Sequence, residues 1–296
     1  MISEDSYVLV SAAYNEGKYI ENTILSVISQ DVRPALWIIV SDGSTDETDA
    51  IVEKFAVLNE FIRLHRMTED HPRNFAAQVH AINVGIGQIQ KERFGFIGNL
   101  DADITIEPSY FRLLLGKFRQ NPRLGLAGGA IYEKFSDGSF KYRRGNRVTS
   151  VAHAVQLFRR ECFMALGGAY RPLPYGGPDA YAETEARMKG WNVESFPELK
   201  VFHHRPTGSS GGVLRYSFRQ GRMDYSMGAS PIFEVIKLLG RVGNKPYMAG
   251  ALSRLTGFVY SYLRGEQRAV SKEFMEYLRQ EQMRKLRGIY RPRWDR

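Results

Sequence analysis

Two aspartates, Asp101 and Asp103, stand one residue apart and are the residues of this chain best suited to chemistry. The apolar run at 94–97 precedes them and is typical of a buried strand, and Glu107 with Pro108 is typical of a helix start. Carboxylates this close repel each other unless a cation bridges them, and a divalent metal shared with substrate phosphates is the usual solution. A polar turn after a strand is the alternative interpretation.

The elements that must position these aspartates alternate between strands and helices. Apolar runs predict strands at residues 7–13, 36–40 and 61–65, and helical spacing predicts helices near 20–28, 46–55 and 75–90. This order predicts an α/β fold with a mostly parallel, doubly wound sheet and helices on both faces. Ligands of such sheets bind at the carboxyl ends of the strands, which is where we expect the aspartates.

The pattern changes after about residue 106. We expect helices at 108–120, 161–166 and 179–189, strands at 124–132 and 193–202, a basic hairpin loop at 136–147 and a mobile Gly- and Pro-rich loop at 169–178. From residue 213 onward the sequence is helical and basic. We therefore predict a sheet domain at 1–212 and a basic helical C-terminal appendage at 213–296.

The composition of the 296 residues bounds the class of protein. Hydrophobic residues make up 43% of the chain, which allows a large core and excludes global disorder. A net charge of +9 indicates an anionic partner, such as a nucleotide, an acidic lipid surface or nucleic acid. From the single cysteine, Cys162, the polar N-terminus and the lack of a long uncharged apolar stretch, we expect a cytoplasmic protein.

Four motifs, in the right order, resemble those of family 2 glycosyltransferases over roughly residues 6–205. They are Ala13-Tyr14-Asn15-Glu16; residues 41–48, Ser-Asp-Gly-Ser-Thr-Asp-Glu-Thr; Asp101-Ala102-Asp103; and Asp179 with Glu183, followed by Arg187 and Gly190-Trp191. The resemblance implies a GT-A fold, with residues 1–212 as the catalytic domain. It also implies transfer of a sugar from a nucleotide-diphosphate sugar to a hydroxyl acceptor, in a single inverting displacement that uses Mn²⁺ or Mg²⁺.

The resemblance further implies a donor-binding site. Its residues would be Ala13, Tyr14, Asn15, Glu16, Asp42, Arg73, Asp101, Ala102 and Asp103. Physically, Asp42 ends a strand at the mouth of the sheet and can accept hydrogen bonds from a nucleobase or a ribose hydroxyl. Arg73 matches a basic residue that the family uses near the diphosphate. The alternatives are a turn-forming role for Asp42, a helix-start position for Glu16 and a solvated surface position for Arg73.

The expected metal ligands are the two aspartates, Asp103 and Asp101, and His204 from the pair His203-His204 that follows the last predicted strand. A histidine of this pair could instead bind the diphosphate together with Arg205, or the two could be an ordinary buried or surface histidine pair.

A general base must take the proton of the acceptor hydroxyl. Asp179 and Glu183 are four residues apart, so they share a helix face. We prefer Asp179, because it starts a helix beneath the Gly- and Pro-rich loop. The alternatives are a helix cap for Asp179 and an ion pair with Arg187 for Glu183. The chain departs from the family's usual Glu-Asp pair, since Pro178 stands at the Glu position.

Several partners follow from the resemblance. A UDP-sugar is the default donor by family frequency, and a glycan or lipid-linked precursor is the expected acceptor. Residues 284–296 hold six Lys and Arg among aromatic side chains, which suggests peripheral attachment to an anionic membrane surface at the inner membrane face. Nucleic acid is not expected, because no motif for it is present.

Two other functions remain as alternatives. A sugar-phosphate nucleotidyltransferase would need a Gly-rich, Arg-containing loop after the first strand, whereas residues 14–18 hold one glycine and no arginine. The other alternative is a non-catalytic protein that binds nucleotide sugars or other anions.

Overall fold

The computed structural model describes residues 6–68, 75–89, 93–143, 145–205, 212–239 and 248–288. The described chain folds into two compact units. The first contains the residues up to Pro172 and those from Pro178 to Arg205, and the second contains Leu173–Gly177 and the residues from Gly212 onward. All strands described belong to the first unit, and the second unit is helical.

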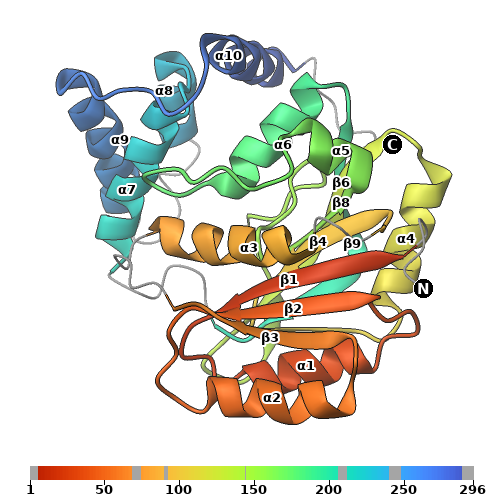
Figure 1. The fold of residues 1–296 in the computed structure, drawn as a ribbon. Coiled ribbons are helices and arrows are strands. Elements are labelled where there is room, and N and C mark those ends of the chain that lie inside the picture. Colours follow the sequence, from red (N-terminus) through yellow and green to blue (C-terminus); the bar gives the residue numbers. More distant parts are fainter. Residues whose placement is uncertain are drawn as a thin grey trace. The chain divides into compact units, whose positions relative to one another are not determined.

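Strands and helices alternate in the first half of the first unit (Figure 1). In chain order they are β1 (Tyr7–Ala13), α1 (Ile20–Ile28), β2 (Leu36–Ser41), α2 (Thr48–Leu58), β3 (Ile62–Arg66), α3 (Phe75–Ile89) and β4 (Phe96–Leu100). The second half consists of β5 (Ile104–Ile106), α4 (Tyr110–Gln120), β6 (Leu124–Lys134), β7 (Phe140–Tyr142), β8 (Val155–Arg159), α5 (Arg160–Ala165), α6 (Pro178–Met188) and β9 (Asn192–His203).

These strands form one sheet in the order β3-β2-β1-β4-β8-β6-β9-β5, with β7 paired to β6. β3, β2, β1 and β4 are parallel, so their carboxyl ends lie at one edge of the sheet. Beyond β4 the sheet is mixed: β8 is antiparallel to β4 and to β6, whereas β9 is parallel to β6. The α/β fold class with its doubly wound sheet is therefore confirmed, with the parallel strands concentrated in the N-terminal half.

Burial on both faces explains the continuous apolar runs of the central strands. Alternate residues of β2 enter different cores, because side chains of a strand point in turn to opposite faces. Trp37 and Ile39 pack in one core with residues of α1, α2 and α4. Ile38 and Val40 pack in the other core with residues of α3, α5 and α6. Helices therefore cover both faces, as we predicted.

Three strands escaped prediction. β7 pairs with the end of β6 inside the segment that we expected to be a hairpin loop. β8 is only five residues long and carries the polar Gln156, whose side-chain amide donates to the carbonyl of Val151 inside the core. β5 follows Asp103 directly and pairs with the end of β9, in the short stretch between the aspartates and the predicted helix at 108–120. Short strands of mixed polarity give little periodic signal, and pairing across the sheet decides them.

The second unit contains α7 (Val213–Ser226), α8 (Pro231–Leu239), α9 (Met248–Leu263) and α10 (Lys272–Leu286). α7 and α9 cross closely at two glycines. A Cβ atom on Gly221 would lie 1.8 Å from the carbonyl oxygen of Arg254, and one on Gly257 would lie 2.0 Å from that of Phe218. Among the described residues, none of the helices is long and apolar enough to span a bilayer.

The loop that we predicted to be mobile is anchored in both units. In the second unit, the Tyr175 hydroxyl accepts a hydrogen bond of 2.6 Å from Arg222 and donates one of 3.1 Å to Glu266. In the first unit, Tyr170 is buried, and its backbone exchanges two hydrogen bonds with the side chain of Asn83. These contacts oppose free movement of the segment before α6.

Candidate active site

The turn that carries the two aspartates is held by hydrogen bonds from three sides. The Asp101 amide donates to the carbonyl of Ala154 at 2.9 Å, just before β8. The buried hydroxyl of Thr23 on α1 donates to the Ala102 carbonyl at 2.8 Å. The His204 amide donates to the Asp103 carbonyl at 3.0 Å. The turn after β4 is therefore fixed in place, and both carboxylates are presented at the carboxyl edge of the sheet.

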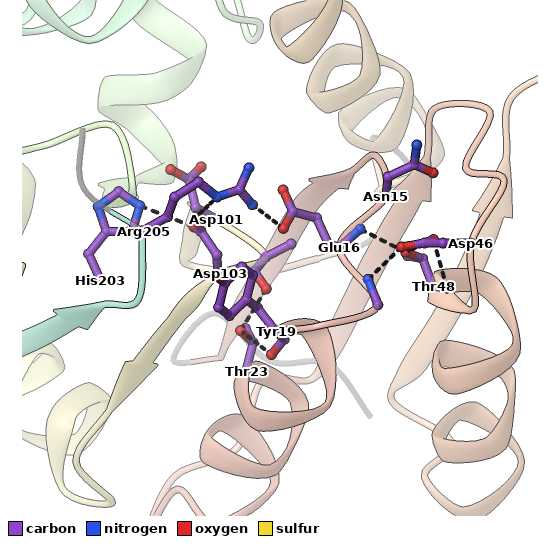
Figure 2. Close-up of polar contacts among 12 residues, drawn as sticks. Asn15, Glu16, Tyr19, Thr23, Asp46, Thr48, Asp101, Asp103, His203 and Arg205 are labelled. Atoms are coloured by element: carbon purple, nitrogen blue, oxygen red, sulfur yellow. Dashed lines mark hydrogen bonds and ion pairs between the residues drawn. The ribbon is translucent and has the colours of Figure 1, made fainter. Parts of the chain in front are cut away.

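A histidine joins the aspartate pair. Asp101, Asp103 and His203 each offer one atom that could ligate a metal, and these three atoms all lie within 4.8 Å of one another. His203 Nε2 lies 3.2 Å from Asp103 Oδ1 (Figure 2). Burial alone would lower the pKa of His203, but the hydrogen bond and the charge of Asp103 outweigh burial and raise it. Two carboxylates and an imidazole form a donor set that suits a divalent cation.

Arg205 connects this cluster to the loop after β1. Its Nε lies 3.2 Å from Asp103 Oδ2, and its terminal nitrogen forms an ion pair with Glu16 (Figure 2). Burial raises the pKa of Glu16 to about 7, with a smaller contribution from the nearby charges of Asp103 and Asp101, although Arg205 lowers it. The Arg205 guanidinium therefore pairs with two carboxylates, Glu16 and Asp103, that lie far apart in the sequence.

Asp101 has partners that we did not predict. Gln78 on α3 donates to Asp101 Oδ1 at 3.0 Å, and His153 Nδ1 lies 3.9 Å from the same oxygen. Burial raises the pKa of Asp101, with the charges of Asp103 and Asp179 adding to the shift, while His153 lowers it.

The loops after β1 and β2 are joined by side-chain hydrogen bonds. Asn15 Oδ1 accepts a bond of 2.8 Å from the Thr45 amide, and Thr48 Oγ1 accepts one of 2.8 Å from the Glu16 amide. Asp46 Oδ2 accepts from the Gly17 amide at 3.0 Å. Asn15 has a φ of +52°, in the left-handed region that asparagine tolerates better than most residues. Hydrogen bonds with residues 45–48 after β2 therefore fix the conformation of residues 15–17 after β1.

Asp42 and Ala13 lie side by side at the ends of two parallel strands. The Asp42 amide donates to the Ala13 carbonyl at 2.9 Å, and the Asp42 side chain is buried. Tyr14, the next residue after Ala13, is 45% exposed. The residues predicted for the donor site therefore occupy the ends of β1, β2 and β4, with the exception of Arg73, which lies outside the described residues.

The two candidate bases have different surroundings. Asp179 lies in the first turn of α6 and is partly exposed. Glu183 is 4% exposed, and its Oε1 accepts hydrogen bonds from the Val151 amide at 2.6 Å and the Ser150 hydroxyl at 3.0 Å. Burial raises the pKa of Glu183 to about 8, against the opposing charge of Arg187. Glu183 is therefore bound into the interior, and Asp179 is the accessible acid of the pair.

His204, which we predicted as a metal ligand, is not part of the cluster. Its Nε2 lies 3.0 Å from Thr105 Oγ1, and its ring packs against those of Tyr19 and Phe140. Burial lowers its pKa. Consecutive residues at the end of a strand point to opposite faces, so the geometry that brings His203 to the aspartates turns His204 away from them.

Sequence reasoning also missed Thr23, Gln78 and His153. Thr23 stands in the apolar stripe of α1 and is fully buried, which is a weak sign that its hydroxyl has a specific partner. No local sequence pattern marks Gln78 or His153, because both reach Asp101 only through the packing of other elements beside β4.

Comparison with known proteins identifies the family. Residues 8–172, more than half of the chain, match the profile of glycosyl transferase family 2. The poly-β-1,6-N-acetyl-D-glucosamine synthases of Staphylococcus epidermidis and of Staphylococcus aureus strain COL are 30% identical over 122 and 118 residues. Each alignment covers 40% of this chain and 26% of the relative, so the chain matches about a quarter of those proteins.

Solved structures agree on the fold. TarS residues 1–349 of Staphylococcus aureus, in complex with UDP-GlcNAc, gives a TM-score of 0.56 at 14% identity and covers 92% of this chain and 78% of its own. The mannosyltransferase PcManGT of Pyrobaculum calidifontis, in complex with GDP-Man and Mn²⁺, gives 0.57 at 17% identity, with 98% and 87% covered. At these identities the likeness concerns the fold alone. The chain belongs to glycosyl transferase family 2 and has the GT-A fold.

Proposed function

We propose that this enzyme transfers a sugar from a nucleotide-diphosphate sugar to a hydroxyl acceptor, in a single inverting displacement assisted by a divalent cation. The observation that carries the proposal is the convergence of Asp101, Asp103 and His203 at the carboxyl edge of the sheet, where β1 and β2 deliver Asn15 and Asp42. Ligands of open α/β sheets bind at this edge.

The donor would lie across the ends of β1, β2 and β4. Asp42 would accept hydrogen bonds from the nucleobase or the ribose, and the metal cluster would face the diphosphate. The solved relatives were captured with UDP-GlcNAc and with GDP-Man, so the fold accommodates more than one base. A UDP-sugar is our default donor for this chain, and Arg73 remains a predicted contact of the diphosphate.

The residues present fit a Mn²⁺ or Mg²⁺ ion. Asp101, Asp103 and His203 would hold it. Nδ1 of His203 is buried and has no hydrogen-bond partner among the described residues, so the polar contact of this ring is made by Nε2. The cation would neutralise charge that builds up on the departing nucleoside diphosphate. Arg205, next to the same carboxylate, would add a second positive group at that place.

Asp179 is the residue that we assign as general base. It would take the proton of the acceptor hydroxyl while that oxygen bonds to the anomeric carbon and the bond from this carbon to the phosphate oxygen breaks. The electron pair of the broken bond leaves with the nucleoside diphosphate. Glu183 is less suited to act as the base, because it is buried and accepts hydrogen bonds from the Ser150 hydroxyl and the Val151 amide.

We propose that the acceptor is a glycan or a lipid-linked precursor of a glycan. Two curated relatives are named as synthases of a β-1,6-linked N-acetylglucosamine polymer, which supports a glycan or a lipid-linked glycan precursor as the acceptor class. A lipid-linked acceptor would place the enzyme at the inner face of a membrane. The basic segment at 284–296, on which that prediction first relied, is described only as far as Gly288.

Thermal unfolding with a panel of nucleoside diphosphates and nucleotide sugars, each with and without Mn²⁺, tests the donor site. A ligand at one hundred times its Kd stabilises the folded state by about 2.7 kcal/mol, which should raise the melting temperature by roughly 5–10 °C. We expect a Mn²⁺-dependent shift with one base in the wild type, and its loss in Asp103→Asn.

The control is Asp31→Asn, which changes an exposed aspartate that pairs with Arg112. This variant should keep the whole ligand-induced shift. An equal shift in Asp103→Asn and in the wild type would contradict the assignment of the metal site.

A further inference from the structure

The positive charge of this protein is concentrated in its C-terminal part. Residues 207–296 contain 17 Lys and Arg against 7 Asp and Glu, whereas the 206 residues before them contain 24 against 25. The excess of ten positive charges in this part therefore accounts for the whole net charge of +9. A concentration of this kind attracts anionic surfaces.

Helix α8 in the second unit has its charged side inward and its apolar side outward. Glu234 is 5% exposed, while Ile232, Val235 and Ile236 are 63%, 49% and 43% exposed. The three apolar residues recur at intervals of three and one, so they share a face of the helix. A surface helix in a protein surrounded only by water normally shows the opposite arrangement.

Helix α9 shows the same inversion. Arg254 lies on its inner side and donates from Nε to Asp224 Oδ2 at 2.7 Å. Met248, Leu252, Val259 and Leu263 are all exposed and follow one another at spacings of four, seven and four residues, which place them in one stripe along the helix. α8 and α9 contact each other within the second unit.

Buried ion pairs hold the inward side of both helices. Lys237 lies 3.1 Å from Asp224 and 3.1 Å from Glu234, and Arg254 also pairs with Asp224. Two acids and two bases balance there, so these bases do not contribute to the excess of positive charge. Separating them would leave buried charges without partners, which is strongly unfavourable. The two helices therefore cannot rotate their apolar stripes inward at low cost.

We propose that the exposed stripes of α8 and α9 form a docking face for an anionic lipid bilayer. Apolar stripes on amphipathic helices enter the boundary between headgroups and acyl chains, and surrounding basic residues attract anionic headgroups. Arg215 on α7 and Arg264 after α9 are exposed beside exposed apolar neighbours, Leu214 and Leu263 respectively. The proposal rests on the second unit and does not depend on the donor site.

A second copy of the chain fits this face less well. Two identical faces would meet in a symmetric dimer and would bring two strongly positive segments together. An anionic bilayer offers the opposite charge as well as an apolar layer, so the charge favours the bilayer.

Flotation with lipid vesicles tests the proposal. The vesicles are pure phosphatidylcholine in one arm and an equal mixture of phosphatidylcholine and phosphatidylglycerol in the other, at physiological salt. We expect the wild type to float only with the mixed vesicles. The double variant Ile236→Ser with Leu252→Ser should lose binding about tenfold or more, since burying either of these side chains is itself worth about that factor.

The matched control is the double variant Val57→Ser with Leu58→Ser on α2 of the first unit, where the residues are 85% and 73% exposed. It should float like the wild type. Equal flotation of the docking variant and the wild type would overturn the proposal, as would a wild type that stays unbound with the mixed vesicles. A wild-type dimer that becomes monomeric in the docking variant, measured by light scattering, would assign the face to a second copy. The nucleotide-induced thermal shift should be unchanged in both variants, so a failure here is distinct from a failure of the donor site.

Discussion

Replacing Glu183 by Gln should reveal that this carboxyl group is uncharged in the folded protein. Burial raises its pKa from the ordinary value of 4.5 to about 8. Between these two values the folded state keeps the proton and the unfolded state releases it, so the free energy of unfolding falls as the pH rises. The slope is about 1.4 kcal/mol per pH unit, or about 4 kcal/mol from about pH 5 to about pH 8. Glutamine cannot ionise and retains an acceptor for Val151 and Ser150.

Urea unfolding of the wild type and of Glu183→Gln across this pH range measures the difference. The two proteins should be similarly stable near pH 5, and the variant should become progressively more stable than the wild type towards pH 8. Other titrating groups cancel, because both proteins carry them. Stability curves that stay parallel would refute the reasoning, since they would show that Arg187 keeps Glu183 ionised in the fold.

The same variant separates the two candidate bases. If Glu183 is a neutral residue of the interior, Glu183→Gln should retain sugar transfer, whereas Asp179→Asn should lose about 10²–10⁴-fold in rate, as expected for removal of a general base. A comparable loss of transfer in both variants would reassign the base or make both residues necessary.

Two predictions on stability concern contacts that support the two units. Thr23→Val keeps the shape of the side chain but leaves the Ala102 carbonyl without its buried donor, so the free energy of unfolding in urea should fall by about 1–3 kcal/mol. Thr23→Ser keeps the hydroxyl and should recover most of this loss. Gly221→Ala would force a methyl group against the Arg254 carbonyl and should destabilise the second unit by about 1–3 kcal/mol or more. The control is Gly116→Ala, whose new methyl group would meet open space, and this variant should be neutral or stabilising in the same assay.

Much of the arrangement of the candidate donor site could be predicted, because its residues stand at the ends of strongly patterned strands. Leu36 to Val40 is a continuous apolar run, and it marks β2 as buried on both faces and Asp42 as a residue at the mouth of the sheet. The same logic placed Asp101 and Asp103 after β4. Parallel strands bring their carboxyl ends together whatever lies between them in the sequence, so local patterns are enough to gather these residues.

The remaining contacts depend on register and packing, which no local pattern contains. Whether His203 or His204 faces the aspartates is decided by the pairing of β9 with β5, in which His203 stands opposite Ile104. Arg205 and Glu16 pair across 189 residues. Leu173–Gly177 belongs to the second unit, and Tyr175 within it forms hydrogen bonds with Arg222 of α7 and with Glu266, although the surrounding sequence indicates only a loop.

Both units bury acidic groups, and the balance of charge distinguishes the two clusters. In the second unit, Asp224 and Glu234 face Lys237 and Arg254, so the cluster is neutral and can remain closed without a ligand. In the part of the first unit that the structure describes, Glu16, Asp101 and Asp103 face one permanent cation, Arg205, together with histidines that are charged only when protonated. When all three are ionised, the carboxylates exceed the guanidinium by two negative charges, which is the charge that one divalent cation would balance. Burial, which raises the pKa of Glu16 and of Asp101, disfavours this ionised state unless such a cation is present. The imbalance therefore favours a metal-binding role for the first cluster, and the balance favours a structural role for the second.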